Sequence, residues 1–197
     1  MSDKIQLPTS DGQTLEARWD HAVTPTAAAV FCHPHPHDGG SMNAPLMIGV
    51  TLRLVERGFS VLRFNFRGTG SSTGSHDEGR SEILDVAAAV DLALGTGLPL
   101  GIGGWSFGAS VALSWLADQP SPPPYVGIAP PPDKLPDSLP PGSKRIILGT
   151  RDQVVDIQAL MAYADRQLID VVLTPGDHFF HGRGKKIGDL VAQGLTG

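Results

Sequence analysis

The stretch Gly104-Trp105-Ser106-Phe107-Gly108 decides the fold class of this 197-residue chain. It joins an apolar segment at residues 98–103, predicted to be a strand, to residues 109–117, whose pattern is helical. A strand that turns sharply into a helix holds the residue at the turn in strained backbone geometry with its side chain exposed. Flanking glycines leave room for such a turn, and the helix N-terminus behind it supplies free N–H groups. The stretch therefore predicts that Ser106 is a nucleophile.

Composition and charge limit the classes of partner. The net charge is −5 and the longest basic run is Lys185-Lys186, so no nucleic-acid partner is predicted. No apolar run approaches the ~18 residues that span a bilayer, and the N-terminus lacks a signal-peptide pattern. A single cysteine, Cys32, leaves no internal disulfide and suits a reducing compartment. We expect one domain over residues 1–197, cytoplasmic and without a membrane partner, as a monomer or homodimer.

Predicted strands and helices alternate along most of the chain. A hairpin at residues 4–7 and 13–19, turning at Ser10-Asp11-Gly12, comes first. Strands are then predicted at residues 27–32, 60–66, 98–103, 125–129, 145–148 and 169–173, and helices at 44–56, 82–94, 109–117, 157–167 and 184–195. This alternation predicts a mainly parallel sheet of about seven to eight strands with helices on both faces. The run Pro130-Pro131-Pro132 predicts a short rigid loop over the site, where no lid domain has room.

Ser106, Asp152 and His178 each come just after a predicted strand, at the sheet edge where functional side chains gather. A serine hydroxyl needs a base to take its proton, and a carboxylate must hold the imidazole in the right tautomer. We therefore predict that Ser106 is the nucleophile, His178 the base and Asp152 the carboxylate that orients it. Asp156 is the alternative acid, although its position favours a helix N-cap, and His181 is the alternative base, which we expect to pack at the start of the last helix.

The run from His33 to Asp38, directly after a predicted strand, is expected to contribute to an oxyanion hole. Because Pro34 and Pro36 have no N–H, the backbone N–H of His35 is predicted to act with that of Phe107. Trp105 is predicted to contact substrate, with core packing an equal alternative. The alternating His33, His35 and His37 also permit a metal site. No Glu or Cys ligand pattern accompanies them, so neither a metal nor any other cofactor is predicted.

Several blocks resemble a small lidless bacterial branch of the α/β-hydrolase superfamily, similar to dienelactone hydrolases and short-chain carboxylesterases. The blocks are His33-Pro34-His35-Pro36, residues 39–43, residues 64–74, the strand-to-helix turn at residues 104–108 (the elbow), and Asp177-His178-Phe179-Phe180. They lie in order from about Gln6 to the last helix. The resemblance implies an α/β-hydrolase fold without a lid, and a triad of Ser106, Asp152 and His178. Dienelactone hydrolases use a cysteine nucleophile, and Ser106 departs from that.

The expected function is hydrolysis of small, short-acyl carboxylic esters through an acyl-enzyme on Ser106. A thioesterase, or an amidase or peptidase, would use the same triad. A metal-dependent hydrolase built on His33, His35 and His37 is a less favoured alternative. A non-catalytic binding protein on the same scaffold is the third class.

Overall fold

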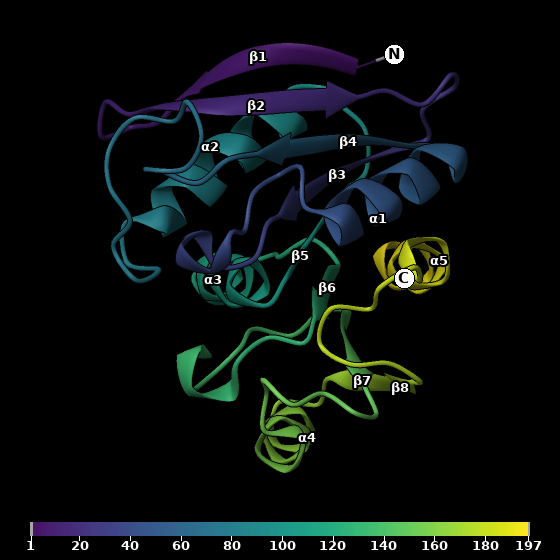
Figure 1. Cartoon of the computed structure of the whole chain (residues 1–197). Coiled ribbons are helices and arrows are strands. Elements are labelled where there is room, and N and C mark those ends of the chain that lie inside the picture. Colours follow the sequence, from purple (N-terminus) through teal and green to yellow (C-terminus); the bar gives the residue numbers. More distant parts are fainter. Residues whose placement is uncertain (1, 197) are drawn as a thin grey trace.

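The computed structural model describes residues 2–196, and its strands form one eight-stranded sheet in the order β1-β2-β4-β3-β5-β6-β7-β8 (Figure 1). β1 and β2 form an antiparallel hairpin, β2 pairs antiparallel with β4, and all further pairs are parallel. The strands are β1 (Ser2–Pro8), β2 (Thr14–Asp20), β3 (Ala27–Cys32), β4 (Phe59–Phe64), β5 (Leu100–Trp105), β6 (Tyr125–Ile128), β7 (Lys144–Gly149) and β8 (Asp170–Thr174). The predicted sheet and N-terminal hairpin are confirmed.

Helices cover both faces of this sheet, as predicted (Figure 1). They are α1 (Pro45–Glu56), α2 (Glu82–Leu94), α3 (Phe107–Ala117), α4 (Ile157–Arg166) and α5 (Gly184–Leu195), with 3₁₀ turns η1 (Pro36–Asp38) and η2 (Pro132–Lys134). α1 packs on α5, and α2 packs on α3. At the α1–α5 crossing, a Cβ on Gly49 would lie 2.8 Å from Gly184 Cα, so glycine lets the two backbones approach closely. None of the helices within residues 2–196 combines the length and apolar character needed to cross a membrane.

The central strand β5 begins and ends two residues later than the sequence predicted. Its glycines have weak strand propensity, but β3 and β6 pair with it on both sides and keep it extended through Trp105. A Cβ on Gly103 would lie 2.3 Å from the carbonyl oxygen of Val126, so the neighbouring backbone requires glycine there. The extension carries the strand directly into the turn at Ser106, and α3 begins at Phe107 rather than at residue 109.

Buried ion pairs fix the long connection between β4 and α2, residues 65–81. Arg67 at its start contacts Asp85 of α2 (Nη2–Oδ1, 2.7 Å) and Asp11 of the β1–β2 turn (Nη1–Oδ2, 2.8 Å). The Asp85 side chain is fully buried, and it also accepts a hydrogen bond from the Arg67 backbone N–H at 2.9 Å. Removing one member of such a pair leaves a buried charge without a partner. The loop is therefore anchored at its start to α2 and to the β1–β2 turn.

Candidate active site

Ser106 sits at a strained turn between β5 and α3, with φ 53° and ψ −121°. Its backbone N–H donates to Ile128 O of β6 at 2.7 Å, which ties the turn to the sheet. A Cβ on Gly104 would lie 2.7 Å from Gly108 C, and one on Gly108 would lie 2.3 Å from His33 O. Both contacts are with backbone that cannot move away. The elbow geometry therefore requires glycine at both flanking positions.

Asp152 and His178 follow β7 and β8, and their side chains meet. His178 Nδ1 donates to Asp152 Oδ2 at 2.9 Å, and both side chains are almost fully buried. The other carboxylate oxygen, Oδ1, accepts from the N–H groups of Val154 and Val155 at 2.9 Å each. Burial acts to raise the pKa of Asp152, but the hydrogen bonds from His178 and from the two backbone N–H groups outweigh it and hold that pKa below its usual value. The carboxylate is thus kept ionised beside the imidazole.

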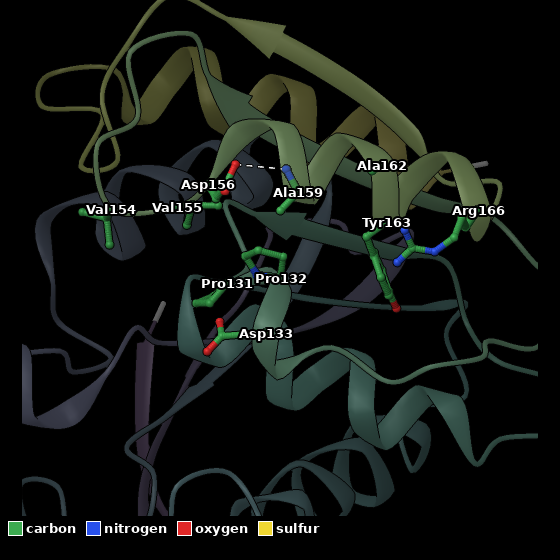
Figure 2. Close-up of a pocket in the computed structure, with 10 residues that line it drawn as sticks. All are labelled: Pro131, Pro132, Asp133, Val154, Val155, Asp156, Ala159, Ala162, Tyr163 and Arg166. Carbon is green, nitrogen blue, oxygen red and sulfur yellow. Dashed lines mark hydrogen bonds between the residues drawn. The ribbon is translucent and has the colours of Figure 1, made fainter.

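The alternative acidic residues have other partners. Asp156 Oδ1 accepts from Ala159 N at 3.0 Å and caps α4, which is the role its position before the helix favours (Figure 2). Asp177 Oδ1 accepts from Phe179 N and Phe180 N at 3.1 and 3.0 Å. Of the three aspartates near the ends of β7 and β8, Asp152 is the one bonded to His178.

A cavity of about 530 Å³ opens in front of Ser106. His178 and His35 lie on its wall, together with the carboxylate residue Asp38 and with mostly apolar or small residues that include Leu46, Trp105, Val154 and Phe179. Trp105 Nε1 donates to His178 O at 3.1 Å, so this side chain both lines the cavity and holds the backbone of the candidate base. Within residues 2–196, Ser106 Oγ makes no hydrogen bond to His178, a contact that in hydrolases often tightens only when substrate binds.

His181 also lines this cavity, with its ring stacked on Phe179 at 5.6 Å between centroids. The sequence predicted that it packs at the start of the last helix. The helix α5 begins at Gly184, as predicted, but His181 lies three residues before it and is exposed at the cavity rim. It belongs to the cavity wall and has no contact with the Asp152 carboxylate in the described chain.

Phe107 and His35, whose backbone N–H groups are predicted to bind an oxyanion, lie next to Ser106 in the chain and on the cavity wall, respectively. Phe107 is the first residue of α3, so its N–H precedes the first intrahelical bond. His35 lines the cavity, and its carbonyl oxygen accepts from Asp38 N at 3.2 Å and Gly40 N at 3.0 Å, which fixes the loop. Within residues 2–196, neither N–H donates to a protein acceptor.

The less favoured alternative, in which His33, His35 and His37 together form a metal site, is contradicted by the position of His33, which is fully buried with both ring nitrogens hydrogen-bonded. Its Nδ1 donates to Pro34 O at 2.6 Å, and its Nε2 accepts from Phe66 N at 3.0 Å. Burial lowers the pKa of His33 to about 4, so the ring is neutral and both nitrogens are occupied. His35 and His37 remain available. A residue that the sequence did not single out, His76 of the 65–81 loop, lies beside them.

A second cavity of about 580 Å³ lies next to the first, between η2 and α4 (Figure 2). Pro131 and Pro132 line it together with Tyr163 and Arg166, and the exposed Val154 lines both cavities. The proline run was predicted to lie over Ser106. It forms the wall of this neighbouring cavity instead and is not among the residues around Ser106, because η2 turns it toward α4.

A mainly parallel sheet, a strained serine elbow and a histidine bonded to a buried carboxylate define the α/β serine hydrolase class, here without a lid. A solved lidless α/β serine hydrolase from Xanthomonas campestris is 30% identical, with a TM-score of 0.89 over 99% of this chain and 94% of that chain. An alpha-beta serine hydrolase homologue from Coxiella burnetii is 27% identical, with a TM-score of 0.88 over 98% of this chain and 97% of that one.

An uncharacterised protein of Rickettsia prowazekii is 32% identical over 188 residues, which cover 84% of this chain and 77% of the relative. No protein-family model matches. The chain belongs to the lidless α/β serine hydrolases, as the sequence blocks implied.

Proposed function

We propose that this hydrolase cleaves small, short-acyl carboxylic esters through an acyl-enzyme on Ser106, with His178 as general base and Asp152 as its orienting carboxylate. One observation carries the proposal. Ser106 stands at a strained elbow on the wall of a cavity that it shares with His178, whose Nδ1 is bonded to the buried Asp152. A buried carboxylate at Nδ1 keeps the proton on that nitrogen and leaves Nε2 unprotonated to accept the serine proton.

The reaction would proceed in two balanced halves. Ser106 Oγ bonds to the ester carbonyl carbon while His178 Nε2 takes the hydroxyl proton, and the N–H groups of Phe107 and His35 stabilise the oxyanion. Collapse breaks the bond to the alcohol, which leaves with the proton from His178. Water then attacks the acyl-enzyme with His178 again as base, which releases the carboxylic acid and restores Ser106.

The cavity supports the choice of small, uncharged acyl groups. Its wall is mainly apolar, with Leu46, Trp105 and Phe179 among its larger side chains. A volume of about 530 Å³ is within the range of small-molecule sites. Because the site has no lid to cover a long chain, we expect acetyl and butyryl esters to be cleaved faster than lauroyl esters.

The test compares wild type with Ser106→Ala and Ser110→Ala on p-nitrophenyl acetate, butyrate and laurate, with a thioester and an anilide of the same acyl group alongside. Ser110 is the matched control because it is a buried serine one helical turn further on, with no hydrogen-bond partner for its hydroxyl within residues 2–196. A fluorophosphonate probe with mass spectrometry identifies the labelled serine.

We expect Ser106→Ala to lose both hydrolysis and labelling, and Ser110→Ala to keep both. Ester hydrolysis unchanged in Ser106→Ala would refute the nucleophile. A thioester or anilide cleaved well above the matched ester would keep the triad but replace the proposed substrate class.

A further inference from the structure

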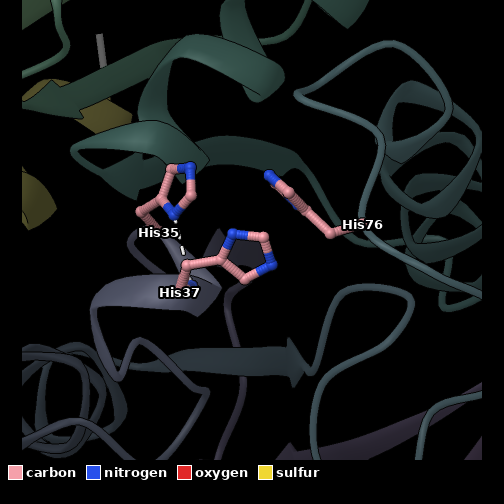
Figure 3. A group of neighbouring side chains, drawn as sticks. All are labelled: His35, His37 and His76. Atoms are coloured by element: carbon pink, nitrogen blue, oxygen red, sulfur yellow. Dashed lines mark hydrogen bonds between the residues drawn. The ribbon is translucent and has the colours of Figure 1, made fainter.

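His35, His37 and His76 form a cluster of imidazoles that the proposed ester chemistry does not use (Figure 3). His35 is the N-cap of the turn η1 after β3, His37 lies within that turn, and His76 comes from the 65–81 loop. One nitrogen of each ring lies within 4.8 Å of the other two. Ring centroids are 5.4 Å apart for His35 and His37, and 4.8 Å apart for each of them and His76. Two segments far apart in sequence thus present three nitrogens to one centre.

This spacing is close to that of a metal site. Zn²⁺ binds histidine nitrogen at about 2.0–2.1 Å, and tetrahedral geometry places two such nitrogens about 3.3 Å apart. Drawing together nitrogens that are at most 4.8 Å apart needs rotations of side chains, not movement of strands. His37 is exposed and can rotate. His35 Nδ1 accepts a 3.2 Å hydrogen bond from His37 N, and this bond has to break when either nitrogen of the neutral His35 ring binds a metal.

His76 supplies the second, independent sign of a ligand. Its side chain is only 6% exposed, and both ring nitrogens are buried without a hydrogen-bond partner within residues 2–196. Nδ1 lies 2.8 Å from Glu82 Oε1 but is not aligned to donate, and the Glu82 carboxylate accepts instead from the N–H groups of Asp77 and Gly79. A buried imidazole nitrogen without a hydrogen-bond partner is costly, and a bound metal ion would remove that cost for the one nitrogen that it coordinates.

Carboxylates surround the cluster. Glu82 lies on one side of the His76 ring, and Glu78 Oε1 is 3.5 Å from its Nε2. Asp38 Oδ2 is 3.9 Å from His35 Nδ1. A carboxylate beside the second nitrogen of a histidine ligand fixes the ring and increases its basicity, and nearby negative charge offsets that of a dication. Three imidazoles favour Zn²⁺, Cu²⁺, Ni²⁺ or Co²⁺ over Mg²⁺ or Ca²⁺.

We propose that His35, His37 and His76 bind one first-row transition metal ion of the Zn²⁺ type, which ties the loop after β3 to the 65–81 loop. The site is separate from the Asp152–His178 pair but shares His35 with the wall of the Ser106 cavity. The Phe107 ring packs against both the His35 ring and the His76 ring, with its centroid 5.1 Å from each. Binding of the ion does not depend on the proposed ester chemistry.

The test uses the full chain without an affinity tag, treated with EDTA and exchanged into metal-free buffer. Zn²⁺ is titrated by calorimetry, and Co²⁺ by its visible absorption, which reports nitrogen ligation directly. The variants are His37→Gln and His76→Gln. His21→Gln is the matched control, because His21 is an exposed histidine paired with Asp3 at the far edge of the sheet.

We expect one Zn²⁺ per chain in wild type and His21→Gln, a Co²⁺ absorption band in both, and a rise in Tm on adding Zn²⁺. Affinity should fall at least tenfold in His37→Gln and His76→Gln. Because His37 is exposed, His37→Gln decides the matter if His76→Gln does not fold. The proposal is overturned if wild type shows no saturable binding, or if all variants bind with equal affinity. Fluorophosphonate labelling of Ser106 in the same samples tests the ester chemistry separately.

Discussion

Replacing Asp152 by asparagine is the sharpest test of the proposed roles of Asp152 and His178, because the backbone N–H groups beside residue 152 fix the orientation of the new amide. In the native chain, Oδ1 accepts from Val154 N and Val155 N, and Oδ2 accepts from His178 Nδ1. An asparagine there keeps its oxygen at the two N–H donors. Turning the amide over would set its NH₂ against both donors, at about 1–3 kcal/mol for each donor left unsatisfied. The NH₂ group therefore faces His178.

That orientation puts the imidazole in the wrong tautomer. Since the NH₂ group can only donate, His178 Nδ1 must accept, and the ring proton moves to Nε2. Nε2 then cannot take the proton of Ser106. In serine proteases the same change lowers kcat about 10⁴-fold while leaving the geometry intact. We expect kcat of Asp152→Asn on p-nitrophenyl acetate to fall about 10³–10⁴-fold, with KM changed little.

Asp156→Asn is the matched control for this experiment. Asp156 caps α4 through Ala159 N, and asparagine is an equally good N-cap, so activity and stability should stay close to wild type. Steady-state kinetics and circular dichroism on both variants give the comparison. The proposed role of Asp152 is refuted if kcat of Asp152→Asn stays within tenfold of wild type, or if Asp156→Asn loses as much activity as Asp152→Asn.

Three further outcomes are expected. Gly108→Ala should lower the free energy of unfolding in urea by at least about 1–3 kcal/mol, because its Cβ would meet His33 O at 2.3 Å; an unchanged midpoint would contradict the tight elbow. Arg67→Met should cost about 3–5 kcal/mol in the same assay, since it leaves the buried Asp85 unpaired, and full stability would mean that Asp85 is neutral in the fold. The lowered pKa of Asp152 means that its ionised form stabilises the fold above its usual pKa near 4, and that this contribution is lost as pH falls through the lower folded pKa. The stability advantage of wild type over Asp152→Asn should therefore shrink as pH falls below about 4, and an advantage that does not shrink there would contradict the lowered pKa.

The order of elements could be predicted from sequence because apolar runs, turns and helical spacing are local signals. Parallel strands place their carboxyl ends at one edge, so residues following β5, β7 and β8 had to converge. The exact ends of β5 could not be predicted in this way. Its last residues, Gly104 and Trp105, are extended because β3 and β6 pair with them, which is a tertiary effect that overrides glycine's weak strand propensity.

Those parts of the candidate site that depend on chain order and local chemistry could be predicted from sequence. Those that depend on the direction in which a side chain points could not. Asp152 and Asp156 both follow β7, and the position of Asp156 directly before a predicted helix already favoured the N-cap that it forms. His76 has no motif around it and reaches His35 only because the 65–81 loop folds back over η1. No spacing rule within one segment could have found it.

The histidines of the loop after β3 have different surroundings. Pro34 and Pro36 hold φ near −65° and have no N–H to donate, and His35 between them is extended, with φ −55° and ψ 125°. His33 is bound inside the sheet by Phe66 N, which anchors the loop, while His35 faces both the Ser106 cavity and the cluster with His76. A change at His76 would therefore reach Ser106 only through His35 and the Phe107 ring, and would leave the hydrogen bond between Asp152 and His178 untouched. Replacing His76 and replacing Asp152 should therefore have separable effects. The first should alter the side of the cavity formed by His35 and Phe107, and the second should alter the protonation of His178.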